Sequence, residues 1–171
     1  MTPTELGDNL ARLVWESFSD FIADGDTEVP LAKLGITLVD GVPDPQTTEE
    51  ALIFLMWAHT RGAQLAFVRR APEPLVKAGL DALHSAVFDD MVQHGTPAAH
   101  LPIFEQRVSI RYAEYNQAAD IADEMLGRAI IRHLTGNADA GSEATQFVAE
   151  RAIAVADPLR DFLEEVELVE S

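Results

Sequence analysis

Four polar side chains interrupt an otherwise apolar segment: His59, Thr60, Arg61 and Gln64. Thr60 and Gln64 are four residues apart, so a helix places them on one face. Arg61 has the same spacing from Trp57 and can stack on the indole ring. A histidine inside a helical core must find hydrogen-bond partners. This half of the helix therefore either borders a polar pocket or emerges at the surface, with His59 as a hydrogen-bonded core residue.

A second polar group lies further along the chain. Arg107, Arg111 and Glu114 are spaced i, i+4 and i+7 and share one helix face, with Tyr112 and Tyr115 beside them. Arginine binds carboxylates and phosphates through paired hydrogen bonds, so Arg111 and Tyr115 could hold a small anion. The alternative is a surface salt bridge between Arg111 and Glu114, worth roughly a few tenths of a kcal/mol. The two groups together give the candidate ligand-binding residues His59, Arg61, Gln64, Arg107, Arg111, Glu114 and Tyr115.

The metal candidates are two histidines with nearby aspartates. Asp81 and His84 are spaced i, i+3, and Asp90 and His94 are spaced i, i+4. Carboxylate-bridged metal sites in helical bundles use Glu-x-x-His pairs, a pattern that does not occur in this sequence. The alternative is a solvated helix face. We therefore expect no metal and no cofactor, and these four residues are the weak metal candidates.

Several motifs of known chemistry are missing from the sequence. The chain has no cysteine, which excludes thiolate metal sites and cysteine nucleophiles. Phosphate-binding loops, dinucleotide-binding glycine patterns, nucleophile elbows and HExxH are also missing. The acidic segment 24–28 resembles the start of a calcium loop, but the loop's sixth position is Val29 and its twelfth is Gly35. We expect no catalytic residues.

The charge of the chain excludes some partners. There are 29 acidic residues against 12 basic ones, which gives a net charge of −17. Such a chain repels nucleic-acid phosphates and anionic membranes, so neither is expected as a partner. Only Lys33 and Lys77 are lysines, which is typical of a GC-rich coding bias or a salt-tolerant proteome. With no signal peptide or membrane-spanning run in view, we expect a bacterial, cytoplasmic protein.

Helix signals recur along the sequence. A capping box at Thr2–Glu5 begins a helix over 3–23, and a second box at Thr47–Glu50 begins one to about residue 70. The second helix is apolar on every side over 51–58 and should be buried. Further helices are expected over 75–94, 102–134 and 142–156, the last bending at Asp157-Pro158 and continuing to about residue 166.

The remaining segments are irregular. Glycines and prolines break up residues 24–46, within which 36–39 could be extended. Gly127 is a weak point of the long 102–134 helix, which would span roughly 50 Å as one piece and could serve as the backbone of the bundle or as an arm for dimerisation. The acidic tail over 164–171 should be frayed.

These signals predict one all-α domain over 1–171, an antiparallel bundle of five to six helices with an irregular 24–46 segment. The leading hypothesis is a non-enzymatic, homodimeric bundle that binds a protein partner or a small ligand. One alternative is a metal-binding or enzymatic bundle with a site of histidine and carboxylate side chains in its core. Another is a ligand-sensing regulatory domain without its own DNA-binding segment.

Overall fold

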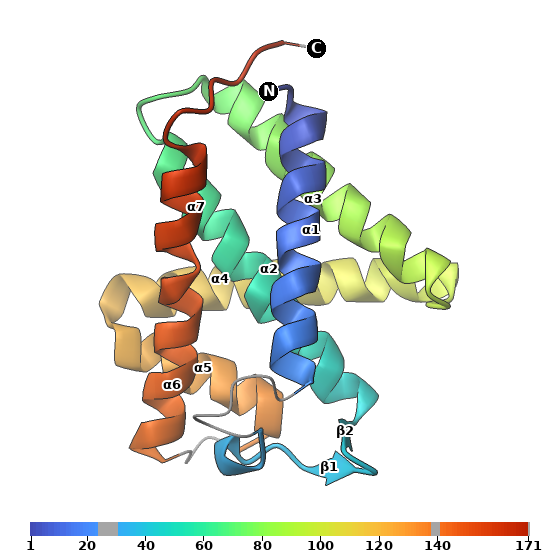
Figure 1. Cartoon of the computed structure of the whole chain (residues 1–171). Coiled ribbons are helices and arrows are strands. Elements are labelled where there is room, and N and C mark those ends of the chain that lie inside the picture. Colours follow the sequence, from blue (N-terminus) through green and yellow to red (C-terminus); the bar gives the residue numbers. More distant parts are fainter. Residues whose placement is uncertain (24–30, 138–140, 171) are drawn as a thin grey trace.

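The computed structural model describes residues 1–23, 31–137 and 141–170, and helices predominate in these ranges (Figure 1). The all-α fold predicted from the sequence is confirmed. The described residues form seven α-helices: α1 (Pro3–Ile22), α2 (Pro45–Phe67), α3 (Glu73–Gln93), α4 (Leu101–Ile121), α5 (Asp123–Thr135), α6 (Ser142–Ala154) and α7 (Ala156–Leu163). They also form two 3-10 turns, η1 (Leu31–Leu34) and η2 (Ala98–His100), and two short strands, β1 (Leu38–Val39) and β2 (Val42–Pro43).

Helix α2 is the centre of the fold. It contacts α1 on one side and α7 on the other, and it also packs against α4, α5 and α6. Its segment 51–58 is buried on every face, as the sequence predicts; Ile53, Phe54, Leu55 and Met56 are completely covered. A helix that is apolar all round can be stable only with neighbours on all sides, which fixes α2 in the middle.

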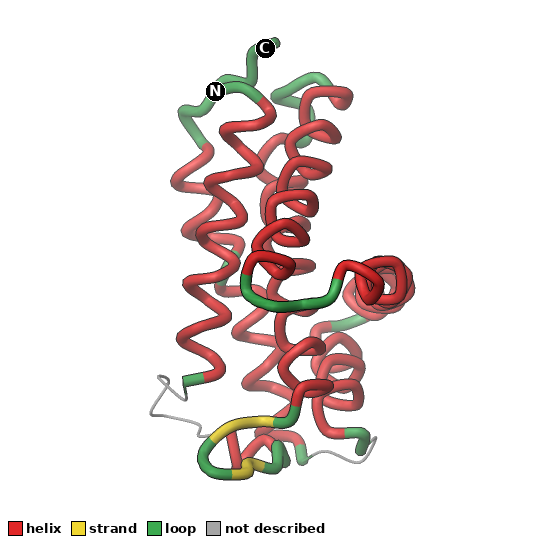
Figure 2. The backbone as a smooth tube through the Cα atoms, turned by 90° about the vertical axis from the view of Figure 1, so that its right-hand side faces the viewer, coloured by secondary structure: helices red, strands yellow, loops and turns green. Residues whose placement is uncertain are grey.

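The other helices surround α2 in a defined arrangement. α1 packs along α3, while α6 and α7 follow one another along another side of α2 (Figure 1). α4 crosses behind this set instead of running along it, and Figure 2 shows it nearly end-on. Because α3 packs mainly on α1, it makes few contacts with α2.

The segment after α1 holds the two strands. Leu38 pairs with Pro43 and Val39 with Val42 in a small antiparallel hairpin. Asp40 and Gly41 at its tip have φ values of 53° and 77°, and a two-residue hairpin turn of type I′ requires a positive φ at both positions. The acidic segment 24–28, which resembles the start of a calcium loop, lies outside the described residues.

Helix α2 starts earlier than the capping box predicts. Its cap is Asp44, whose carboxylate accepts a 2.8 Å hydrogen bond from the Thr47 backbone N–H, and Pro45 occupies the first helical position. The expectation that Thr47 is the cap is therefore wrong. Proline is pre-organised for the first helical position, which favours the earlier start. Glu50 is then free to pair elsewhere.

The predicted 102–134 helix is two helices. The chain breaks at Ala122, which is extended with φ −170° and ψ 153°, and not at Gly127. The break lets α5 turn back and bury Leu126, Ile130 and Ile131 against α2 and α6. The bend expected at Asp157-Pro158 falls slightly earlier, at Val155 between α6 and α7.

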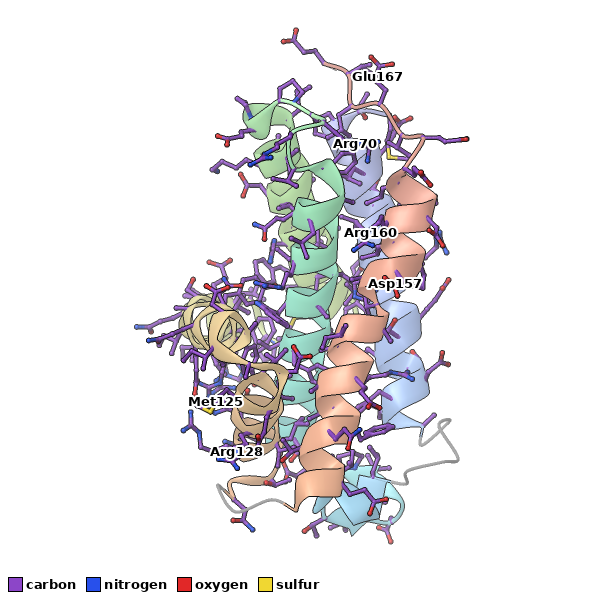
Figure 3. The ribbon with its side chains drawn as sticks, turned by 90° about the vertical axis from the view of Figure 1, so that its left-hand side faces the viewer. Arg70, Met125, Arg128, Asp157, Arg160 and Glu167 are labelled. Carbon is purple, nitrogen blue, oxygen red and sulfur yellow. The ribbon has the colours of Figure 1, made fainter. Side chains whose placement is uncertain are left out.

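The acidic tail is docked where the sequence predicts fraying. The Val169 N–H donates to the carbonyl of Met1 at 3.0 Å, and Leu168 is buried. The Arg70 guanidinium, labelled in Figure 3, donates to the carbonyls of Leu163 and Glu164 at 3.1 and 2.6 Å. These bonds cap the end of α7, which hydropathy alone does not reveal.

Among the described residues, no helix has a stretch that is both long and apolar enough to cross a bilayer.

Candidate functional site

The polar half of α2 faces several different neighbours. Thr60 and Gln64 line a cavity against α3, whereas His59 lines another cavity between α1 and α7. Arg61 lies 5.7 Å from the Trp57 ring centroid, the stacking expected from the sequence, and 3.8 Å from Asp120. The structure therefore does not bring these candidates to one place.

Arg111 belongs to a buried ion pair with α2. Its guanidinium donates to both carboxylate oxygens of Glu50 at 2.9–3.2 Å. The Glu50 side chain is 1% exposed and that of Arg111 18%. The expected surface salt bridge between Arg111 and Glu114 does not form, because Arg111 points toward the central helix. The guanidinium of Arg111, which could have held an anionic ligand, is therefore already occupied by the carboxylate of Glu50.

The remaining candidates on α4 extend this network. Arg107 pairs with Glu49, and Glu114 pairs with Arg132 and accepts a 2.6 Å hydrogen bond from His133 on α5. Tyr115 is buried within the same network, and its hydroxyl has no hydrogen-bond partner in the described residues. This network joins α2, α4 and α5. Its charged side chains pair with one another and so hold these helices together.

His133 is a neutral member of this network. Burial, and next the positive charge of Arg111, lower its pKa to about 4. Neutral His133 can still donate its Nε2–H to Glu114, which agrees with their short contact. The histidine therefore stays uncharged at neutral pH.

We expect the free energy of unfolding to fall as the pH drops from 6.5 toward 4. A histidine whose pKa is lowered by folding binds its proton first in the unfolded state, so its contribution is present above 6.5 and is lost below. The slope of the unfolding free energy against pH approaches but stays below about 1.4 kcal/mol per pH unit, because solvent screens part of the charge on His133. Urea unfolding at pH 7 and pH 5 measures it. His133→Gln should flatten the difference, and an equal slope in both proteins contradicts the expectation.

The metal candidates are engaged in separate contacts. Asp81 pairs with Lys77 at 2.8 Å, and Asp90 accepts a 2.8 Å hydrogen bond from the Trp15 indole. His84 and His94 each place Nδ1 against a backbone carbonyl of their own helix. Across residues 1–23, 31–137 and 141–170, no three metal-ligating side chains gather at one point.

The cavity that contains a buried hydroxyl with no hydrogen-bond partner in the described part of the chain lies where α2 and α3 splay apart and α4 crosses behind them. We call this the Thr60 groove, a cavity of about 500 Å³. Phe67, Val76 and Leu80 give it apolar walls, and Thr60 and Tyr112 lie at its polar end. The limited contact between α2 and α3 leaves this space open.

The polar end of the Thr60 groove has one unsatisfied group. Thr60 is 7% exposed, and its hydroxyl lies near that of Tyr112 without reaching hydrogen-bond geometry. The Tyr112 hydroxyl is 2.8 Å from Nε2 of His84, whose Nδ1 is 2.6 Å from the carbonyl of Leu80. The Nδ1 nitrogen must therefore carry the hydrogen, and the Tyr112 hydroxyl donates to Nε2.

The groups at this end are neutral. Burial lowers the pKa of His84 and raises the pKa of Tyr112. At the rim, Lys77 and Arg69 are balanced by Glu73 and Asp81. Arg69 has a φ of 60°, a conformation uncommon outside glycine, where the chain leaves α2.

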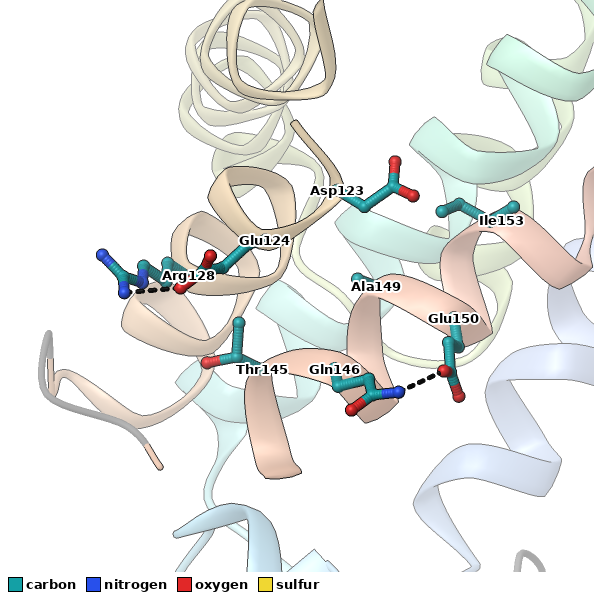
Figure 4. A pocket seen from close by; sticks show the side chains of 8 residues that line it. All are labelled: Asp123, Glu124, Arg128, Thr145, Gln146, Ala149, Glu150 and Ile153. Atoms are coloured by element: carbon teal, nitrogen blue, oxygen red, sulfur yellow. Dashed lines mark hydrogen bonds and ion pairs between the residues drawn. The ribbon is translucent and has the colours of Figure 1, made fainter. Parts of the chain in front are cut away.

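A second hollow, of about 510 Å³, separates α5 from α6 (Figure 4). It holds Asp123, Glu124 and Glu150, but two of these carboxylates already have partners. Glu124 pairs with Arg128, and Glu150 accepts a hydrogen bond from Gln146 (Figure 4). The hollow therefore offers less unmet chemistry than the Thr60 groove.

Sequence reasoning found only part of the Thr60 groove. It marked Thr60 and Gln64 as sharing a face, and the structure places both in the cavity wall. It considered His84 only as a metal candidate and missed its partner Tyr112. The i, i+4 spacing of Thr60 and Gln64 on α2 was the available signal for this groove. The crossing of α4 over α3, which brings Tyr112 to His84, leaves no signal in the sequence.

No family model, curated protein or solved structure matches the chain.

Proposed function

We propose that the protein binds a small molecule in the Thr60 groove and performs no chemistry on it. The observation that carries this proposal is the Thr60 hydroxyl, which is buried and has no hydrogen-bond partner among the described residues. A buried hydroxyl without a hydrogen bond costs roughly 1–3 kcal/mol. A ligand that supplies the missing bond recovers this free energy, and the apolar walls add to its affinity.

The arrangement favours binding over catalysis. Both ring nitrogens of His84 are engaged, one by Leu80 and the other by Tyr112. Activation of a hydroxyl nucleophile needs an adjacent base within hydrogen-bond reach, and the Thr60 hydroxyl has no such contact.

The donors and acceptors point to a carboxamide. Thr60 has a hydrogen to donate, and the Tyr112 oxygen can accept because its own hydrogen goes to His84. An amide carbonyl and an amide N–H satisfy these two groups together. Since the floor is neutral and the rim charges balance, we propose an uncharged carboxamide with an apolar body.

The wider setting is also proposed. Ile103, Ile110 and Ile121 lie exposed on one side of α4. This apolar face supports the homodimer expected from the sequence. Light scattering measures the oligomeric state. We also propose a bacterial origin, which the two lysines against ten arginines support, and the cytoplasmic location expected from the sequence.

Thr60→Val tests the binding proposal, because valine keeps the shape of threonine and removes the hydroxyl. We expect the free energy of unfolding to rise by about 1–2 kcal/mol, since an unsatisfied buried group is removed. Binding of benzamide, followed by two-dimensional NMR, should weaken about tenfold. Benzoate, which is charged, and acetophenone, which lacks the N–H, should bind the unmodified protein more weakly than benzamide.

Thr47→Val is the matched control. Thr47 is also a buried threonine of α2, but its hydroxyl donates to the carbonyl of Leu134 at 3.1 Å. Its replacement should lower the free energy of unfolding by about 1 kcal/mol and leave benzamide binding unchanged. If Thr60→Val destabilises the protein and binds benzamide as before, the proposed function is wrong.

A further inference from the structure

A second cavity lies on another side of α2, between α1 and the α6–α7 segment. It has a volume of about 360 Å³, and we call it the His59 groove. Leu13, Val155, Leu159 and Phe162 form its apolar walls. Phe162 is 44% exposed and is the aromatic member of these walls. The walls suit an apolar body of aromatic size.

His59 contributes an unsatisfied acceptor to this groove. Its side chain is 3% exposed, and Nδ1 lies 2.8 Å from the carbonyl of Leu55, so Nδ1 carries the hydrogen. In the described part of the chain, Nε2 forms no hydrogen bond and is left as a bare acceptor. Burial lowers the pKa of His59, which keeps the ring neutral. A ligand must therefore bring a hydrogen to Nε2.

The rim of the His59 groove has the opposite charge to the chain as a whole. Arg12 and Arg151 both line it, and none of its described lining residues is acidic. This is notable in a chain with 29 acidic and 12 basic residues. Arg12 also forms an exposed ion pair with Glu16 on its own helix at 2.9 Å. Arginine binds carboxylates with charge-assisted hydrogen bonds. The rim therefore suits an anionic group on the ligand, and the floor suits a hydroxyl.

We propose that the His59 groove is a second binding site, which takes a small hydroxyl-bearing carboxylate such as a phenolic acid. The hydroxyl donates to Nε2 of His59, the apolar body lies against Phe162 and Leu159, and the carboxylate reaches Arg12 and Arg151. The site uses residues other than those of the Thr60 groove.

Calorimetry with 3-(4-hydroxyphenyl)propanoate as the probe tests this proposal. Two analogues each remove one feature: 3-phenylpropanoate lacks the hydroxyl, and 3-(4-hydroxyphenyl)propan-1-ol lacks the carboxylate. We expect each loss to weaken binding about tenfold, equivalent to the loss of one good hydrogen bond. These comparisons use the unmodified protein, so they do not depend on whether a variant folds.

Variants then assign the contacts. His59→Leu should abolish the preference for the hydroxylated probe, while His59→Gln, which keeps an acceptor, should retain part of it. Arg12→Gln and Arg151→Gln should weaken the carboxylate probe and leave the alcohol unaffected. Arg160→Gln is the control, because Arg160 is an exposed arginine of α7 outside the lining (Figure 3).

The proposal is overturned if the probe shows no saturable binding at millimolar concentration, or if the three compounds bind equally. It is also overturned if Arg160→Gln weakens binding as much as Arg12→Gln and Arg151→Gln. Thr60→Val should leave this probe's affinity unchanged, which separates failure here from failure of the Thr60 groove.

Discussion

Glu50→Ala should lower the free energy of unfolding by about 3–5 kcal/mol, because it leaves the guanidinium of Arg111 largely buried without its counter-charge. Urea unfolding followed by circular dichroism measures the change. Glu50 itself is almost completely covered, so water cannot easily replace the lost carboxylate.

The adjacent ion pair is the matched control. Glu49 and Arg107 join the same two helices, but their side chains are 41% and 30% exposed. Glu49→Ala should therefore change the free energy of unfolding by at most about 1 kcal/mol. Equal losses for Glu49→Ala and Glu50→Ala would contradict the assignment of the Glu50 pair as the buried one.

A double variant separates the cost of an orphaned charge from the value of the pair. Glu50→Leu with Arg111→Leu removes both charges, and we expect a stability within about 1–2 kcal/mol of the unmodified protein. A loss as large as that of Glu50→Ala alone would show that the pair itself stabilises the fold strongly.

Gly127→Ala should lower the free energy of unfolding by about 3 kcal/mol, at the upper end for overpacking of a core. A Cβ atom at Gly127 would lie 2.2 Å from the carbonyl oxygen of Thr145, a backbone atom of α6 that cannot rotate away. α5 and α6 must then separate. Thermal unfolding of the variant measures the loss.

Gly141→Ala is the control for this glycine. Gly141 has a φ of −61°, and a Cβ there would meet no atom of the described residues within 4 Å. We expect a change of less than about 1 kcal/mol, since alanine adopts this conformation without strain. A Gly127→Ala variant as stable as the Gly141→Ala variant would show that the two helices are less tightly packed than the structure places them.

The sequence predicts where the helices lie in the chain better than it predicts which helices pack against one another. Caps, prolines and apolar periodicity located the helices, and the uniform apolarity of 51–58 identified the buried one. The break at Ala122 was missed because alanine favours a helix; the break arises from the burial of Leu126 and Ile130 against other helices. Local signals cannot contain that information.

The same limit applies to the polar residues. Spacing suggested Arg111 with Glu114, yet Arg111 pairs with Glu50, 61 residues away. Thr60 stood out as a polar interruption, but only the splay between α2 and α3 shows which side it faces. A sequence identifies unusual side chains, and the packing of distant elements decides their surroundings.

Helix α2 is the element through which the two cavities can be thermodynamically linked. His59 and Thr60 are consecutive residues, and successive side chains of a helix point about 100° apart, so each opens on a different cavity. A ligand in either cavity thus acts on the same central helix. Any effect of one ligand on the affinity of the other must be equal in both directions.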